Sequence, residues 1–329
     1  MRPFKYVRAN DPNAAARALA ANPRAKFLAG GTNILDLMKE DVERPDELID
    51  LSRLKLAEIK AARTGGVSIG ALAKNSDTAN HPLVRRNYPL LTQAIVAGAS
   101  GQLRNMATNG GNLMQRTRCQ YFYDTAMPCN KREPGTGCGA LEGLNRIHAI
   151  FGWSEKCVAT YPGDMANALY ALEATVRVRG ADGRERTIPV AEFHRLPGDT
   201  PERDNNLRHG ELITAIELPQ SNFAKNSYYL KVRDRASYAF ALVAVAAGLE
   251  LDGGRIKGAR VVLGGVAHKP WRSLEAEAAL AGQTASEETF RQAAEIALKG
   301  AKPLAHNAYK VELGKRAVVR ALMRAAKLA

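Results

Sequence analysis

The sequence predicts a mixed α/β unit that extends to about residue 220, followed by a smaller α+β domain. Short apolar runs alternate with helical patterns through the first part of the chain. After residue 221, two long apolar strand patterns meet at Gly253-Gly254, which is typical of an antiparallel hairpin, and three helical segments follow. At 329 residues, the chain exceeds the usual size of one domain and is long enough for two or three.

The N-terminal segment reads as strand, helix, strand and helix in turn. "RPFKYVRA" predicts a strand, and "NDPNAAARALAAN" predicts a helix capped by Asp11 or Asn10, with Pro12 in its first turn. The apolar run in "AKFLAGGTNILDLMKE" ends at a glycine pair, after which Thr32 and Asn33 open the next helix. "DELIDLSRL" and "GGVSIGALAKNSD" then predict short strands.

The middle of the chain is predicted to be mostly helical. "SDTANHPLVRRNYPLLTQAIVAGA" reads as helix up to Gly98 and Gly101, and a second glycine pair follows in "RNMATNGGNLMQ". "GDMANALYALEATVRVRG" predicts a helix opened by Asp164 and then a strand, and "ELITAIELP" predicts another strand. The C-terminal helices are predicted at residues 273–281, 286–299 and 308–326.

Composition indicates a folded protein, since 46% of residues are hydrophobic and 24% are charged. No uninterrupted apolar run reaches about 18 residues, so we expect no membrane span. The basic N-terminus lacks the apolar stretch of a secretory signal, and we therefore expect a cytoplasmic protein. The net charge of +14 gathers partly on a C-terminal helical pattern. Because no nucleic-acid motif accompanies it, we expect no nucleic-acid partner.

All the cysteines lie in one Gly- and Pro-rich stretch that reads as neither helix nor strand. They are Cys119, Cys129, Cys138 and Cys157, with gaps of nine, eight and eighteen residues. A reducing compartment disfavours disulfides, and the gaps are wider than the usual spacing of paired zinc ligands. Long irregular loops with four thiolates suit an iron-sulfur cluster, which we favour over disulfides, zinc or four separate core cysteines.

The residues around the cysteines fit such a cluster. Gly135, Gly137 and Gly139 are expected to point backbone N–H groups at the sulfurs. Nearby cations would offset the negative charge of a thiolate-bound cluster, although they are equally ordinary on a loop surface: Arg118, Lys131 and Arg132.

The two glycine pairs share a pattern that is typical of phosphate sites. In "LAGGTN" and "TNGGN" each pair is flanked by hydroxyl or amide side chains and precedes an apolar, helical stretch. Glycine allows a ligand to approach the backbone closely, and N–H groups at a helix start attract anions. Either pair alone is also compatible with an ordinary tight turn. Together they predict a cradle for one pyrophosphate, on a scaffold without a Walker A or a convincing Rossmann motif.

Five ordered segments resemble the FAD-binding subunit of the molybdenum hydroxylases, the xanthine dehydrogenase and aldehyde oxidase family. They are "FLAGGTNILDLM", "GASGQLRNMATNGGNL", "CVATYPGDMANALYALEATVRV", "GELITAIELP" and "KVRDRASYAFALVAVA". The resemblance covers nearly the full chain. It implies a two-subdomain FAD-binding fold of the vanillyl-alcohol oxidase (PCMH-like) type, with a C-terminal α+β domain of the carbon monoxide dehydrogenase flavoprotein type.

The cysteine stretch is the main departure from that family, whose ordinary members connect the flanking motifs by a short loop. A comparable insertion in the flavin subunit of hydroxybenzoyl-CoA reductase carries a [4Fe-4S] cluster. "RTRC", "YFYDT" and "PCNKR" are also similar to FAD subunits of bacterial periplasmic aldehyde oxidoreductases. The resemblance therefore implies a [4Fe-4S] cluster on the four cysteines.

The resemblance also implies which residues bind FAD. The expected set is Lys26, Phe27, Leu28, Ala29, Gly30, Gly31, Thr32, Asn33, Ile34, Thr108, Gly111, Asn112, Asp164, Ile213 and Lys231. The two glycine turns would hold the diphosphate. Asp164 would bind a ribose or ribityl hydroxyl, unless it only caps its helix. Ile213 would pack on the flavin, and Lys231 would lie at the polar edge of the ring, unless it is a solvated strand-end lysine. No catalytic residue is predicted, because none of the six histidines has a recognisable catalytic context.

The implied protein is an electron-transfer subunit in three parts: residues 1–60 and 61–220 bind FAD, with an iron-sulfur insertion at 115–158, and residues 221–329 form the C-terminal domain. It would join a large molybdenum-cofactor subunit and a small [2Fe-2S] subunit in a heterotrimeric aldehyde oxidoreductase, and pass electrons to an external acceptor. The alternative is a xanthine-, purine- or aromatic-CoA-oxidising relative. Relatives also reach the periplasm by export on a partner that carries a twin-arginine signal, so that compartment is the alternative to the cytoplasm.

Overall fold

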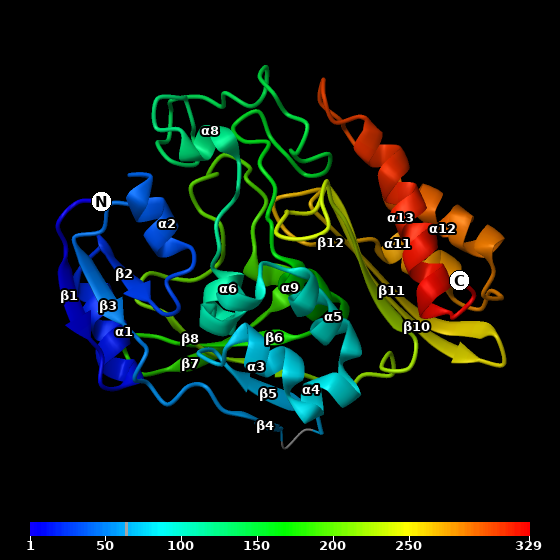
Figure 1. The fold of residues 1–329 in the computed structure, drawn as a ribbon, viewed down its shortest axis with the longest axis horizontal. Coiled ribbons are helices and arrows are strands. Elements are labelled where there is room, and N and C mark those ends of the chain that lie inside the picture. The colour runs from blue at the N-terminus through cyan, green and yellow to red at the C-terminus, as the bar shows by residue number, and fades with distance from the viewer. Residues whose placement is uncertain (63–64) are drawn as a thin grey trace.

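The computed structural model describes residues 1–62 and 65–329, which form three sheets with an irregular segment above them (Figure 1). The first sheet is parallel, in the order β1-β3-β2. Its strands are β1 (Lys5–Arg8), β2 (Ala25–Leu28) and β3 (Glu47–Asp50), with helices α1 (Pro12–Ala21) and α2 (Ile34–Lys39). The first glycine pair follows the end of β2, so the sheet positions that turn at one of its edges.

Local sequence explains both helices of this first unit. Asp11 caps α1 as predicted, because its carboxylate accepts a hydrogen bond of 2.9 Å from the N–H of Ala14. Pro12 occupies the first helical position, where its missing N–H costs nothing. Asn33 precedes the first residue of α2, in agreement with the predicted helix start.

The second sheet has five antiparallel strands in the order β4-β5-β8-β6-β7. They are β4 (Ile59–Ala61), β5 (Val67–Gly70), β6 (Thr175–Arg179), β7 (Glu185–Pro189) and β8 (Leu212–Leu218). Strands far apart in sequence pair here, since β5 lies beside β8. The largest apolar core contains Leu91, Ile95, Leu169, Val176 and Ile216, from this sheet and from the helices α5 (Pro89–Ala97) and α9 (Asp164–Ala171).

Short helices cover this sheet, where the sequence predicted one longer helical segment. They are α3 (Asn75–Asn80), α4 (Pro82–Asn87), α5 (Pro89–Ala97), α6 (Gly101–Met106), α7 (Asn109–Leu113), α9 (Asp164–Ala171) and α10 (Val190–Phe193). The segment is divided at Pro82 and Pro89. The residue before each proline is non-helical, with φ, ψ of −66°, 130° at His81 and −137°, 55° at Tyr88, as expected from the clash between a proline ring and the preceding residue.

The C-terminal unit is the predicted antiparallel sheet with helices on one face (Figure 1). Its strands are β9 (Ser227–Val232), β10 (Val243–Asp252), β11 (Arg255–Gly264) and β12 (Trp271–Arg272), and its helices are α11 (Leu274–Leu280), α12 (Glu287–Leu298) and α13 (Tyr309–Ala325). Gly253 and Gly254 join β10 to β11 with φ of 55° and 85°, as the hairpin prediction requires.

The cysteine-containing segment, residues 115–158, lies above the three sheets (Figure 1). It contains one short helix, α8 (Gln120–Tyr123), and is otherwise irregular, as predicted. Phe122, Ala140 and Val158 are buried in its own small core, against Leu37 of α2. The segment is therefore held in part by apolar packing.

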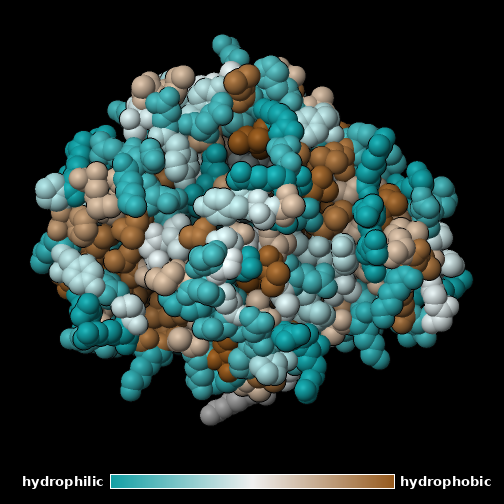
Figure 2. Space-filling model, viewed as in Figure 1, coloured by the Kyte–Doolittle hydropathy of each residue, from teal (hydrophilic) through white to brown (hydrophobic). Residues whose placement is uncertain are grey.

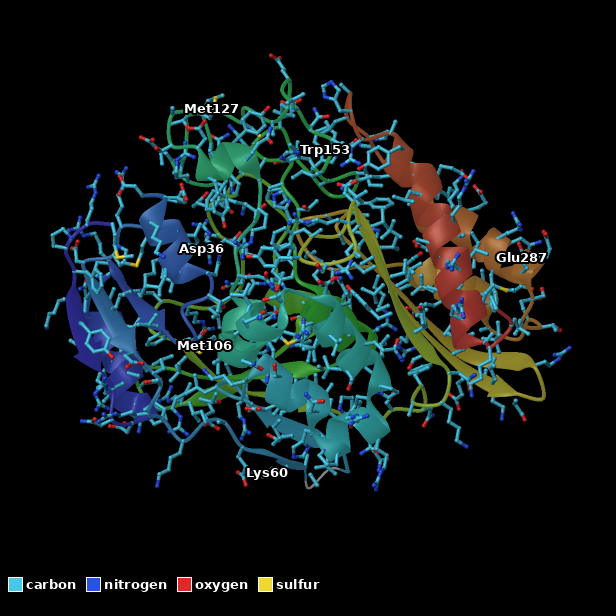
Figure 3. The ribbon with its side chains drawn as sticks, viewed as in Figure 1. Asp36, Lys60, Met106, Met127, Trp153 and Glu287 are labelled. Carbon is cyan, nitrogen blue, oxygen red and sulfur yellow. The ribbon has the colours of Figure 1, made fainter. Side chains whose placement is uncertain are left out.

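Hydrogen bonds fasten this segment to the C-terminal domain. Trp153, at the upper edge of the molecule in Figure 3, donates to the carbonyl of Lys302 at 2.7 Å. The fully buried Lys310 donates to the carbonyls of Ile147, His148 and Gly265 at 2.9, 3.0 and 2.8 Å. The N-terminal end of α13 thus fixes the chain on either side of His148.

Polar side chains cover most of the face shown in Figure 2, with smaller hydrophobic groups over the N-terminal unit and beside the C-terminal helices. Among the helices of the described residues, none is long and apolar enough to cross a membrane.

Candidate cofactor site

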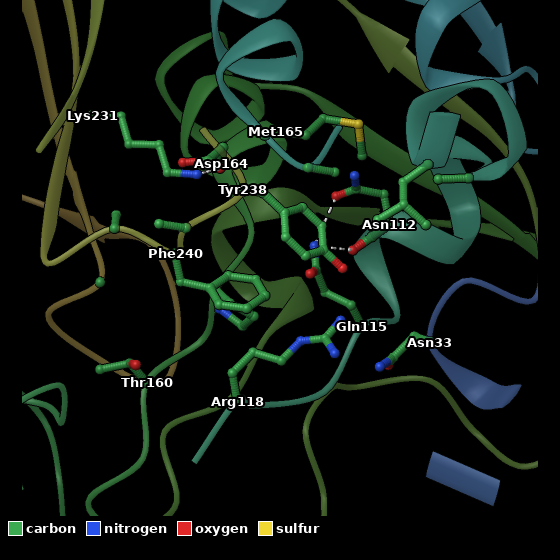
Figure 4. A pocket seen from close by; sticks show the side chains of 18 of the residues that line it. Asn33, Asn112, Gln115, Arg118, Thr160, Asp164, Met165, Lys231, Tyr238 and Phe240 are labelled. Atoms are coloured by element: carbon green, nitrogen blue, oxygen red, sulfur yellow. Dashed lines mark hydrogen bonds and ion pairs between the residues drawn. The ribbon is translucent and has the colours of Figure 1, made fainter. Parts of the chain in front are cut away.

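Two cavities meet at the glycine turns. The first has a volume of about 470 Å³ and the second about 550 Å³. Both are lined by Thr32, Asn33 and Gly111, so the cavities share a wall made by the two turns. The first opens between α5, α9, β9 and the inserted segment, as Figure 4 shows. The second lies against the N-terminal sheet and β8.

The turns pack directly on each other, which explains the glycine at position 30. A Cβ atom there would lie 2.1 Å from the carbonyl oxygen of Met106 and 3.2 Å from Cα of Ala107. Gly31 has φ of 74°, where a side chain would be strained. Thr108 caps α7, accepting a hydrogen bond of 3.2 Å from the N–H of Gly111. The backbone of one turn is therefore set against that of the other.

Amide side chains complete the shared wall. Asn112 donates to Asn75 at 2.9 Å and accepts from Gln115 at 3.0 Å, so its orientation is fixed. Asn33 accepts at 3.0 Å from the N–H of Arg116, while its Nδ2 is buried and has no hydrogen-bond partner in the described part of the chain. A buried donor without an acceptor is rare, and Asn33 lines both cavities.

Asp164 and Lys231 form a buried ion pair in the wall of the first cavity, 2.7 Å apart between Oδ2 and Nζ. Asp164 is the first residue of α9 and Gly163 precedes it as the cap, so its carboxylate binds side chains instead of capping the helix. Lys231 is 4% exposed, which excludes a solvated strand-end lysine. The pair brings α9 and β9 together at the cavity (Figure 4).

Sequence reasoning missed Tyr229, which donates to the other carboxylate oxygen of Asp164 at 2.7 Å. Burial, and then the charge of Asp164, raises the pKa of Tyr229 well above its ordinary value. Tyr229 and Lys231 are two residues apart on β9 and so point to the same face. This spacing of two residues in a strand was the signal in the sequence, because it places both side chains where the carboxylate of Asp164 can accept a hydrogen bond from each.

Ile213 lies in the wall of the second cavity, whereas Lys231 lies in that of the first. The resemblance placed both beside the flavin ring, and the structure separates them. Phe27, Ile34 and Thr108 also line the second cavity, and Asn112 lines the first. Leu28 is the last residue of β2, and Ala29 connects it to the first glycine turn.

A partly buried charge network, also missed from the sequence, borders the second cavity. Arg116 is 2.7 Å from Glu43 Oε1 and 2.7 Å from Asp204 Oδ2, and Lys131 is 2.5 Å from Asp204 Oδ1. Burial alone would raise the pKa of Asp204, but Arg116 and Lys131 lower it to about 2. The network joins the inserted segment to the N-terminal unit and to the loop that contains Asp204.

The four cysteines converge in one core, and all four are free thiols, so none forms the disulfides that were one alternative. Burial raises the pKa of Cys119 to about 12. A hydrogen bond between the Cys138 and Cys157 thiols lowers the pKa of Cys138 and raises that of Cys157. Throughout residues 1–62 and 65–329, no three His, Cys, Asp or Glu side chains have the close grouping of ligands around a single metal ion.

The prediction that glycine N–H groups point at the sulfurs was wrong. Gly135 and Gly137 donate to the side-chain oxygen of Asn130, at 3.0 and 2.9 Å, and Gly139 donates to the carbonyl of Pro128. Other backbone N–H groups serve the sulfurs instead. Cys119 accepts from Tyr121 and Phe122, Cys138 from Ala140, Leu141 and Val158, and Cys157 from Ala159.

The expected cations around the thiols are also engaged elsewhere. Arg118 pairs with Asp36 at 3.0 Å and lies over the ring of Phe240 at 5.1 Å. Arg132 donates to the carbonyls of Tyr121 and Phe122 at 2.8 and 2.9 Å. The charge of Lys131 opposes the rise in the pKa of Cys157, which the Cys138 hydrogen bond and burial cause.

The inserted segment and the first cavity share a wall. Cys119, His148 and Arg118 all line that cavity, together with Asp164 and Lys231. The thiol core therefore adjoins the cavity that contains the buried ion pair.

Family models match both parts of the chain. Residues 2–221 match the FAD binding domain in molybdopterin dehydrogenase, and residues 228–325 match the CO dehydrogenase flavoprotein C-terminal domain. The aldehyde oxidoreductase FAD-binding subunit PaoB of Escherichia coli K12 is 51% identical over 99% of each chain. The glyceraldehyde dehydrogenase medium chain of Sulfolobus acidocaldarius is 29% identical over 88% of this chain and 85% of its own.

Solved structures show the same fold. Carbon monoxide dehydrogenase from Hydrogenophaga pseudoflava matches with a TM-score of 0.77 and 26% identity, over 98% of this chain and 97% of that one. Quinoline 2-oxidoreductase from Pseudomonas putida 86 matches with a TM-score of 0.77 and 24% identity, over 100% of this chain and 98% of that one.

Proposed function

The chain belongs to the family of FAD-binding subunits of the molybdenum hydroxylases, and from that premise we propose that it is the FAD- and [4Fe-4S]-containing electron-transfer subunit of an aldehyde oxidoreductase. The observation that carries the FAD site is the pair of cavities joined at the two glycine turns. This shape matches FAD, which has two bulky ends, the flavin and the adenosine, joined by a diphosphate. The family model that covers residues 2–221 is that of an FAD-binding domain.

The turns hold the diphosphate in this proposal. Gly30 and Gly31 keep the backbone free of side chains, and the unpartnered Nδ2 of Asn33 supplies a hydrogen-bond donor for a phosphate oxygen. Gly111 faces both cavities from the second turn. The residues present therefore fit the group that the family binds.

The flavin ring is assigned to the first cavity and the adenosine to the second. Lys231 lines the first cavity and is held by Asp164, so its ammonium group would stabilise negative charge on a flavin ring bound there. Ile213 and Phe27 supply apolar surface to the second cavity and are assigned to the adenosine. Bound FAD would supply the two-electron and one-electron chemistry.

The cluster proposal rests on the four cysteines in one small core. Backbone N–H groups already point at three of the sulfurs, as they do around thiolate-bound clusters. In a [4Fe-4S] cluster each thiolate binds a different iron. The four sulfurs therefore lie farther apart than the ligands of a single metal ion. Because Cys119 lines the flavin-side cavity, a cluster on these cysteines would adjoin the flavin, and we assign it both electron exchange with FAD and a role in holding the segment.

Partner subunits would supply the oxidation of substrate itself. We assign a large molybdenum-cofactor subunit and a small [2Fe-2S] subunit, with an external electron acceptor after FAD. Aldehyde is the favoured substrate class, because the relative at 51% identity is an aldehyde oxidoreductase subunit, whereas the putative xanthine dehydrogenase subunit XdhB of Escherichia coli K12 is 26% identical. Export on a partner would place the complex in the periplasm, and fractionation decides between that and the cytoplasm.

Glycine substitutions test the FAD site. In Gly30→Ala the new Cβ meets the carbonyl of Met106 and separates the two turns, so the purified complex is expected to lose most of its FAD. Gly101→Ala is the matched control, since a Cβ at Gly101 meets nothing within 4 Å. FAD per chain is measured after extraction. Equal FAD contents in the two variants would refute the assignment of the turns.

Substrate class is tested by anaerobic bleaching of the flavin. An aldehyde is expected to reduce the FAD of the intact complex at least tenfold faster than hypoxanthine at equal concentration. The reverse order would assign the chain to a purine-oxidising complex instead.

A further inference from the structure

Two histidines lie against the sulfurs of the cysteine core. Nε2 of His148 is 3.1 Å from Sγ of Cys119, and Nε2 of His268 is 3.2 Å from Sγ of Cys157. Both rings are buried. His148 belongs to the inserted segment, whereas His268 follows β11 of the C-terminal domain, so the two approach the core from different parts of the fold.

The unused ring nitrogens indicate where the protons are. Nδ1 of each histidine is buried and has no hydrogen-bond partner within residues 1–62 and 65–329. A proton on Nδ1 would therefore be a buried, unsatisfied donor, which is costly. A proton on Nε2 instead points at sulfur, and a thiolate that binds iron can only accept a hydrogen bond. Both considerations favour the Nε2–H form.

The surroundings hold both rings in position. The carbonyl of His148 accepts hydrogen bonds from Lys310 at 3.0 Å and from Asn307 at 3.2 Å, and its N–H donates to the carbonyl of Asn145 at 3.1 Å. The carbonyl of Ala267, beside His268, accepts from the N–H of Tyr161 at 2.9 Å. These bonds fix the backbone that carries each ring.

We propose that His148 and His268 donate Nε2–H hydrogen bonds to the Cys119 and Cys157 ligands and thereby raise the reduction potential of the cluster. This inference rests on the proposed function, because it requires the cluster. An added electron makes the cluster more negative, and donors to its sulfurs stabilise that state more than the oxidised one. His148 also lines the flavin-side cavity, so it is the donor that lies between cluster and flavin.

The test uses His148→Leu and His268→Leu in the purified, cofactor-loaded complex, with the cluster potential measured by EPR-monitored titration. Each variant is expected to decrease the ratio of reduced to oxidised cluster at a given potential by about tenfold, which is a shift of about 59 mV for one electron. His148→Gln and His268→Gln keep an N–H donor and are expected to recover much of the shift.

His194→Leu is the matched control. His194 is also buried with an unpartnered Nδ1, but its Nε2 contacts the carbonyl of Leu113 at 2.9 Å and no sulfur. Its variant is expected to keep the cluster potential of the unsubstituted complex. Unchanged potentials in both leucine variants at His148 and His268, or an equal shift in His194→Leu, would overturn the proposal.

A second measurement needs no variant. Pulsed EPR of the reduced cluster, with ¹⁵N-labelled histidine and with solvent in H₂O or D₂O, is expected to show coupling to histidine nitrogen and to an exchangeable proton. Iron present without these couplings overturns this inference and leaves the proposed function standing. No iron in the unsubstituted complex overturns the cluster itself. If a leucine variant loses its iron, its potential cannot be measured, and the histidine and proton couplings of the unsubstituted complex then test the proposed hydrogen bonds.

Discussion

Asp204 is predicted to be the charge that holds the inserted segment to the rest of the molecule. Its carboxylate lies between Arg116 and Lys131, which both belong to that segment. These cations, acting against the effect of burial, lower its pKa from 3.8 to about 2. At about 1.36 kcal/mol per pKa unit, the ionised carboxylate contributes about 2 kcal/mol to the folded state.

The sign of the pH dependence follows from the direction of the shift. The folded pKa lies below the unfolded one, so the contribution is fully present above pH 4 to 5 and is lost as pH falls through the folded value near 2. About half of it should be gone at roughly pH 3. Asp204→Asn removes the charge at every pH, so the difference in stability between the substituted and unsubstituted proteins should become small in acid.

Hydrogen exchange in the assembled protein measures this effect. At neutral pH, Asp204→Asn is expected to speed local exchange in residues 115–132 and 195–209 by roughly 30-fold, equivalent to about 2 kcal/mol. Asp234→Asn is the control, because Asp234 also pairs with an arginine of the segment, Arg146, but both side chains are half exposed or more. Such a pair contributes about 1 kcal/mol at most. Equal effects of the two substitutions, or an Asp204→Asn effect that is the same at pH 3 and pH 7, would refute this reasoning.

Two further predictions concern the cavity walls. Lys231→Met leaves the buried Asp164 carboxylate without its cation, so the thermal midpoint should fall, with a loss on the order of 3–5 kcal/mol, and Lys231→Met with Asp164→Asn should recover part of it. The flavin potential of Lys231→Met should also fall, and an unchanged potential would contradict the placement of the ring. Thr108→Val removes the cap of α7 and should cost about 1 kcal/mol, seen as weaker FAD retention in equilibrium dialysis. Thr92→Val is the control: the Thr92 hydroxyl donates to the carbonyl of Ala79 and to no backbone group of either glycine turn, so this variant should retain FAD normally.

Local sequence patterns predicted much of the fold. The cap at Asp11, the hairpin at Gly253-Gly254 and the C-terminal helices follow from residue spacing and backbone preference, and the structure contains them. The single helical segment expected after residue 76 is divided at Pro82 and Pro89, because each proline disfavours helical backbone at the residue before it.

Long-range contacts were beyond local patterns. Arg116, Lys131 and Asp204 are 15 to 88 residues apart, and nothing in the sequence near any one of them indicates the other two. His268 is 111 residues from the cysteine that it contacts. The N–H groups of the glycines near the cysteines were expected to point at the sulfurs, but those of Gly135 and Gly137 donate to the side-chain oxygen of Asn130 instead. Ile213 could not be placed in either cavity before the sheet order was known.

The proposed electron-transfer subunit needs both a cluster on the four cysteines and FAD in the joined cavities. The most direct measurement is iron, acid-labile sulfide and FAD per copy of this chain, in the purified complex and in a Cys129→Ser variant. The [2Fe-2S] subunit contributes its own iron, so the difference between the two proteins gives the iron held by this chain. We expect one FAD per copy of this chain in both proteins, and about four iron and four sulfide fewer in the Cys129→Ser variant. Equal iron in both proteins, or a chain that binds zinc in place of iron, would contradict it.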